Sequence, residues 1–354
     1  MNGQFEIYTL LFALVCLPCA AEPYIDIWYG EHQRFGHLGH PQRWVNVLGN
    51  VSPASEIASL TWSLNGSKPR PLSFGEDQRR LARPGDFNVE IDRSELQLGR
   101  NTVTVTVIDR SGRVTQRTSE VEYLSQEQRW PLPYIIDWSK VERIDEVAQV
   151  VDGKWTLTPN GVRTVERYYD RVLAFGDDSW RDYEVSTTVT FHAFTPPLTP
   201  PNNTRVTHAA IALRWPGHDR DEHQPHVKWY PLGATAEFML TTDLKQCRWR
   251  IFDRNPYDSK RPFFWRIFDD NKRFYVESKR HQAIELDKPY GMKHRVETLN
   301  EGRSRYRVKL WPVNESEPTT WDLERIEAGD CVFCSKVATD STAKLPPIPD
   351  ESGH

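Results

Sequence analysis

The sequence predicts an all-β protein. Two observations support this prediction: short segments alternate apolar and polar residues, and 25 Pro and 19 Gly are spread along the 354 residues as turn formers. Helical periodicity never exceeds two turns, apart from a weak pattern over residues 138–150. Side chains of a strand point alternately to its two faces, so such segments build sheets with one apolar face. Sheets of this kind stack face to face around a core.

The charge of the chain is close to balanced, with 45 Lys and Arg against 49 Asp and Glu. A chain of this kind has no long-range field that would draw it to nucleic acid, so no nucleic-acid partner is expected. The 13 Trp, 13 Tyr and 15 Phe suit both β-sandwich cores and surfaces that stack on sugars. The mean hydropathy of −0.64 argues against an integral membrane protein, and no transmembrane segment is expected.

The N-terminus predicts export. Residues 7–17 form an apolar run that is too short to cross a bilayer but suits the core of a signal peptide. Small residues at Cys19, Ala20 and Ala21 predict cleavage before Glu22, and hence a signal peptide over residues 1–21. The location expected is secreted, periplasmic or cell-surface. Because the first six residues contain neither Lys nor Arg, a buried N-terminal strand is the alternative.

Three cysteines remain after this cleavage, namely Cys247, Cys331 and Cys334. An odd number cannot be fully paired. A lone C-x-x-C predicts neither a zinc site nor thioredoxin-type chemistry. Two alternatives stay open. Either Cys331 or Cys334 forms a disulfide with Cys247, or all three cysteines are buried thiols.

Residues 22–124 predict a first β module. Residues 57–64 alternate like a strand and end at an Asn-Gly turn, while residues 101–108 alternate Val and Thr, as in a strand with one wet face. The string from Gly85 to Val103, followed by Asp109 and Gly112, resembles bacterial Ig-like modules. The resemblance implies an Ig-like sandwich of seven strands, and this stretch contains no cysteine for a disulfide.

A second, longer β series follows a linker over residues 125–134 and is expected to span residues 135–338. A proline-rich excursion at residues 195–203 interrupts it, and residues 339–354 are expected to be a disordered tail. The clearest strands lie at residues 183–191, 208–215, 236–241, 248–252, 273–278, 293–299 and 304–310.

The order of motifs in this second region carries a resemblance. Trp180 to Val185 reads W-x-D-Y-x-V, and Tyr306 to Trp311 is followed by Glu317-Pro318 and Trp321. This order resembles the concanavalin A-like/laminin-G superfamily, and it implies a larger jelly-roll sandwich behind the Ig-like one. That fold hosts lectins, glycan hydrolases, lyases and adhesion modules, so it leaves the activity open.

One string resembles a catalytic motif. Residues 90–95 match E-x-D-x-x-E, in which laminarinase-type glycoside hydrolases place two carboxylates on one face of a strand. Here the string lies in the Ig-like module rather than the jelly-roll. We therefore expect Ile91 in the core, the carboxylates in water and no catalysis by this motif.

A loop after residue 217 combines imidazoles and carboxylates. Its candidate metal ligands are His218, Asp219, Asp221 and His223. Carboxylate oxygens suit Ca²⁺ and imidazoles suit Zn²⁺. No cofactor is certain, calcium is the ion that the loop suggests, and a solvated polar loop is the alternative.

Aromatic, basic and acidic residues of the second region suggest a ligand groove. Sugars stack their C–H faces on aromatic rings and hydrogen-bond to Arg and carboxylates. Alternation places Trp249 opposite Arg248 and Arg250, so Trp249 belongs to the core if the arginines line the groove. The candidates are Arg214, Trp215, His226, Trp229, Tyr230, Glu237, Arg248, Arg250 and Glu277.

The function predicted is therefore that of a secreted or envelope glycan-binding or adhesion protein, which uses the concave face of the jelly-roll. The partner expected is a carbohydrate or polysaccharide. The alternative is a glycan hydrolase or polysaccharide lyase acting in the same groove, which is less favoured because no catalytic pair can be named. An adhesion partner with no sugar site is a third reading.

Overall fold

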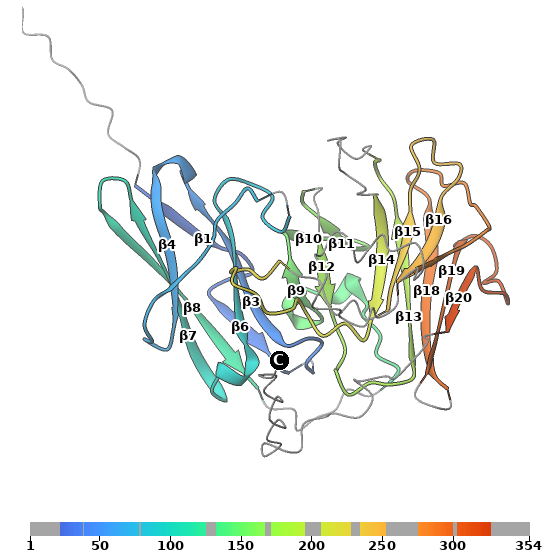
Figure 1. The fold of residues 1–354 in the computed structure, drawn as a ribbon, viewed down its shortest axis with the longest axis horizontal. Helices are drawn as coiled ribbons and strands as arrows, with labels where there is room; N and C mark the ends of the chain where they lie inside the picture. The colour runs from blue at the N-terminus through green and yellow to red at the C-terminus, as the bar shows by residue number, and fades with distance from the viewer. Residues whose placement is uncertain are drawn as a thin grey trace, which may run out of the picture.

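The computed structural model confirms the all-β prediction (Figure 1). Strands and short 3-10 turns make up its regular structure, and the part of the chain that it describes contains no α-helix. No helix within these residues is long and apolar enough to cross a membrane. The described residues are 22–37, 39–77, 79–124, 132–166, 171–194, 207–227, 234–252, 275–299 and 303–326.

Several predictions fall outside these ranges. The signal peptide, Cys331, Cys334 and the tail at residues 339–354 lie there, as does most of the linker. Export, location and the disulfide alternatives therefore stay predictions.

The first half folds as two stacked sheets whose alternating strands enclose one apolar core. Val103, Val105 and Val107 point into this core and are fully buried, while Thr104 and Thr106 face outward, so the predicted wet face is confirmed. The two sheets hold one strand more than the seven implied, including a two-residue strand at one edge. The three-stranded sheet runs β1 (Tyr24–Ile27), β3 (Trp44–Ser52), β6 (Asp86–Asp92), and the five-stranded sheet runs β2 (His32–Phe35), β8 (Val114–Tyr123), β7 (Gly99–Asp109), β4 (Ile57–Leu64), β5 (Arg70–Pro71).

The second half contains two four-stranded antiparallel sheets packed face to face, seen at the right of Figure 1. Phe238, Trp249 and Ile251 from one sheet meet Met292 and Val308 from the other in a single core. One sheet runs β13 (Tyr183–Thr190), β18 (Pro289–Thr298), β19 (Ser304–Pro312), β20 (Leu323–Ile326), and the other runs β14 (His208–Leu213), β15 (Ala234–Met239), β16 (Arg248–Phe252), β17 (Tyr275–Glu277).

Residues 132–166 and 171–174 lie between these two sandwiches (Figure 1). Trp28 and Leu48 of the first half share a hydrophobic cluster with Ile144, Ala148 and Val150, so this segment covers the outer face of the three-stranded sheet. The boundary predicted at residues 134/135, between the linker and the second β region, stays a prediction. The segment comprises η3 (Trp138–Lys140), η4 (Ile144–Glu146), β9 (Gln149–Asp152), β10 (Trp155–Thr158), β11 (Gly161–Thr164) and β12 (Val172–Ala174).

The expectation that the E-x-D-x-x-E carboxylates face water is wrong for Glu90, which is only 2% exposed. Alternation does point Glu90 away from the core of the first half, as predicted. However, that face of β6 is covered by the loop after β14, and the backbone N–H of His226 donates to the Glu90 carboxylate at 2.6 Å. The carboxylate is therefore a contact between the two halves.

A buried charged cluster surrounds this contact. The Arg80 guanidinium lies 2.9 Å from the Glu90 carboxylate and 2.6 Å from that of Asp152, and all three side chains are buried. Burial alone would lower the pKa of Arg80, but the carboxylates of Asp152 and Glu90 raise it above its usual value. His218 lies beside both acids, and burial holds its pKa well below the usual range. We call these four residues the Arg80 cluster.

Candidate functional site

Four of the nine predicted ligand-binding residues lie on one face, the outer face of the β14–β15–β16–β17 sheet. The strand register places Glu237 of β15 opposite Arg250 of β16, and Arg250 opposite Glu277 of β17. Arg248 projects from the same face one row away. Trp249 lies between the arginines in sequence and is 1% exposed in the core, so the alternation argument is confirmed.

The three side chains of this row form a carboxylate–guanidinium–carboxylate ladder. Arg250 Nε lies 3.9 Å from Glu237 Oε2 and 3.6 Å from Glu277 Oε1. The two carboxylate oxygens can therefore be no farther apart than these distances together, about 7.5 Å. Arg248 Nε adds a contact to Glu277 Oε2 at 3.1 Å.

The ladder is partly withdrawn from solvent. The side chains of Glu237 and Arg250 are 17% and 18% exposed, although they stand on an outer sheet face. Partial burial lowers the effective dielectric around the charges and strengthens their hydrogen bonds to a ligand. Glu277 and Arg248 are more open, at 32% and 33% exposure.

Sequence reasoning missed several neighbours of the ladder. His208 Nε2 lies 3.8 Å from Glu237 Oε1, and the rings of Phe252 and Tyr275 lie 5.2 and 5.0 Å from the Arg250 guanidinium carbon. The signal for Phe252 was present, because it stands two residues after Arg250 on the same strand. The pairing of β14 with β15, which brings in His208, is not visible in a local pattern.

The alanines of β14 leave space next to the ladder. Ala210 lies opposite Glu237 and is exposed, while Ala212 on the same strand is half-buried. Ala210, the β14 neighbour of Glu237 in the same row, thus places only a methyl group beside the ladder.

The structure places three other candidates elsewhere. Arg214 donates to the backbone oxygen of Arg181 and to Ser304 Oγ, so it ties the end of β14 to the opposite sheet. Trp215 is buried edge-on against His218, and the ring of His226 lies 4.5 Å from that of Trp44, at the contact between the halves. Trp229 and Tyr230 lie outside the described residues.

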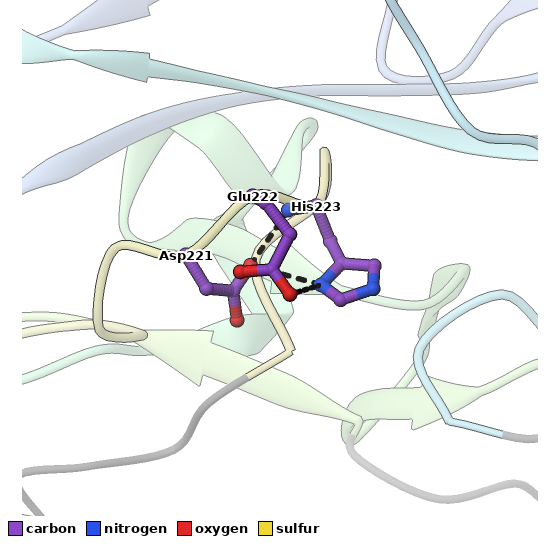
Figure 2. Close-up of side chains that lie close together, drawn as sticks. All are labelled: Asp221, Glu222 and His223. Carbon is purple, nitrogen blue, oxygen red and sulfur yellow. Dashed lines mark hydrogen bonds and ion pairs between the residues drawn. The ribbon is translucent and has the colours of Figure 1, made fainter.

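The structure also separates the four predicted metal ligands from one another. Asp221 and His223 gather with Glu222, their ligand atoms within 4.8 Å of one another, and Figure 2 shows the His223 ring directed at the two carboxylates. His218 belongs instead to the buried Arg80 cluster, and Asp219 faces Arg43 at 3.8 Å.

The group of Asp221, Glu222 and His223 fits Ca²⁺ poorly. Calcium takes six to eight oxygen ligands, whereas this group offers two carboxylates and one imidazole. The Asp221 carboxylate already accepts the backbone N–H groups of His223 and Val227 at 2.9 and 3.1 Å. Burial would raise the pKa of Asp221, but these hydrogen bonds and the nearby histidines lower it. Calcium binding by this loop stays a prediction, which calorimetric titration with Ca²⁺ would test.

Comparison with known proteins adds little to this picture. No family model and no curated protein matches the sequence. Among solved structures, an endo-β-1,4-mannanase from Thermotoga petrophila aligns with 30% of this chain and 21% of its own, at 8% identity and a TM-score of 0.23.

A second solved structure is SGBP-B of the Bacteroides ovatus mixed-linkage glucan utilization locus, in complex with a mixed-linkage heptasaccharide. It aligns with 78% of this chain and 64% of its own, at 10% identity and a TM-score of 0.18. The chain thus spans less than two thirds of either structure. Likeness at this level carries no argument about function, so the case rests on the residues of the candidate face.

Proposed function

We propose that this protein is an exported glycan-binding protein whose ligand lies on the outer face of the β14–β15–β16–β17 sheet. The observation that carries the proposal is the Glu237–Arg250–Glu277 ladder, partly buried on one sheet face. Carboxylates accept hydrogen bonds from sugar hydroxyls, and a guanidinium donates to them in a planar, two-pronged geometry. The rings of Phe252 and Tyr275, in the next row of the same sheet face, add apolar surface beside the ladder.

Binding suits this arrangement better than proton transfer. Both acids lie within 4 Å of one guanidinium, and Glu277 also contacts Arg248. A general acid must instead present a proton to the leaving oxygen of the substrate. Ion-paired carboxylates are suited to accepting hydrogen bonds.

A glycan array probed with the protein, followed by calorimetry on each hit, tests the proposal. Ala210→Trp fills the space beside Glu237 without entering the core, so we expect it to weaken binding at least about tenfold, or about 1.4 kcal/mol. Thr118→Trp, on the outer face of the first half, is the matched control and should leave the affinity unchanged. Equal affinities for the two variants would contradict this location.

The second candidate function is glycan hydrolysis, favoured by the two carboxylates, Glu237 and Glu277, that flank Arg250 on one sheet face. Product analysis on every array hit distinguishes it from binding. If it holds, Glu237→Gln and Glu277→Gln should abolish product formation while the ligand still binds. A product with a new carbon–carbon double bond, visible by its ultraviolet absorbance, would indicate a lyase instead. Binding without any product excludes both enzymes.

A further inference from the structure

Two tryptophans stand on the opposite side of the second sandwich, on the outer face of the β13–β18–β19–β20 sheet. Trp311 is near the end of β19, and Trp321 lies in the segment between β19 and β20. Both side chains are half-buried. Tyr306, Val308 and Leu310 of β19 point into the core, so alternation directs Trp311 outward.

The ring of Trp311 lies over a glycine. Gly291 of β18 is its register partner, and a Cβ atom built on Gly291 would come within 2.5 Å of Trp311 Cε2 and Cζ2. Any side chain at this position would displace the ring. The glycine therefore lets one ring face rest on the sheet, while the side chain stays partly exposed.

Trp321 lies over a row of cations. Its ring centre is 4.6 Å from Lys309 Nζ, 5.0 Å from the Arg307 guanidinium carbon and 5.3 Å from that of Arg295. The segment that carries it is fastened to the sheet, because Glu317 pairs with Lys309 at 2.7 Å and the Lys309 ammonium donates to Pro318 O at 2.6 Å. A ring held in this way loses little conformational entropy when a ligand binds.

The polar groups around the rings point to an uncharged ligand. Lys293, Lys309, Arg295 and Arg307 each have a carboxylate within 4 Å, supplied by Glu184, Glu297 or Glu317. An anionic ligand would therefore have to compete with these acids. Neither indole N–H donates to any residue that the structure describes, so both are available to a hydroxyl group.

We propose that Trp311 and Trp321 form a second glycan-binding surface, which stacks a neutral polysaccharide and is separate from the ladder on the opposite sheet. The C–H faces of sugar rings stack on tryptophan, and their hydroxyls accept from indole N–H. Both ring centres lie near Lys309 Nζ and can be no more than about 10.4 Å apart, so one chain can contact both. Two faces on opposite sides of a sandwich give multivalent binding to a polysaccharide.

Affinity electrophoresis in gels containing laminarin, mannan or xylan tests this proposal, with polygalacturonate as the anionic comparison. The variants are made in the Ala210→Trp background, so that binding reports on the tryptophan surface. Trp311→Leu and Trp321→Leu keep an apolar side chain but lose the flat ring, and each should weaken retention by a neutral polysaccharide at least about tenfold. Trp311→Phe and Trp321→Phe keep an aromatic face and should retain most of the binding.

Thermal unfolding of each variant separates a folding defect from a binding defect, since a leucine variant that melts like its phenylalanine counterpart has lost only the stacking surface. Equal retention of the Leu and Phe variants overturns the proposal, as does preferential retention by polygalacturonate or no retention by any neutral polysaccharide. If Ala210→Trp alone leaves retention intact while the Leu variants lose it, the ladder proposal fails and the tryptophan surface stands.

Discussion

Arg80→Met is expected to destabilise the protein by about 3–5 kcal/mol, the usual cost of removing one partner from a buried ion pair. Arg80 lies between the Glu90 and Asp152 carboxylates, and all three side chains are buried. Methionine has a similar length but no charge, so both acids would remain in the interior without their guanidinium. Urea unfolding followed by circular dichroism measures the loss.

Arg79→Met is the matched control, because it makes the same chemical change at the exposed neighbouring position. An exposed substitution of this kind usually changes the free energy of unfolding by less than about 0.5 kcal/mol. Similar small losses in both variants would show that the Arg80 cluster contributes nothing to stability. A loss confined to Arg80→Met would show that the two halves depend on this contact.

The second sandwich is expected to lose about 3 kcal/mol of stability between pH 6.5 and pH 4, because its core contains a neutral histidine. Burial lowers the pKa of His294 to about 4, although the hydrogen bond between His294 Nδ1 and Ile211 O acts in the opposite direction and raises the pKa. Below pH 6.5 the unfolded chain binds a proton that the folded chain excludes. Stability is therefore complete above pH 6.5 and falls by about 1.4 kcal/mol per pH unit until the folded state also titrates.

His294→Gln isolates this contribution, since an amide N–H can still donate to Ile211 O but does not titrate. The variant should show a shallower fall in unfolding free energy over the same pH range. His281→Gln, at an exposed position of the same half, should keep the full slope. A slope that is the same in wild type and His294→Gln would assign the acid sensitivity to other groups.

The sequence was informative where the direction of a side chain depends on one strand alone. The alternation of Arg248, Trp249 and Arg250 correctly separated a buried ring from two outward charges. The Val and Thr residues of β7 did the same for the first half. Side-chain direction along a strand follows from its period of two, so it can be predicted without knowing the partner strands.

The candidate face could be predicted only in part. Glu237, Arg250 and Glu277 were named as separate candidates, but their order in one row depends on the register of β15, β16 and β17. A shift of one residue in either pairing would turn one set of these side chains into the core. Register is set by packing across both sheets. His208 was missed because its contact with Glu237 depends on that packing.

By itself, the sequence determined the all-β class and the opposite directions of Trp249 and its two neighbouring arginines. Only the tertiary structure decided that Glu90, His218 and His226 belong to a buried contact between the two halves. Glu90 and His226 are separated by 136 positions in the chain. No local pattern reports what covers an outward face, because that cover comes from a distant segment whose position depends on the whole fold.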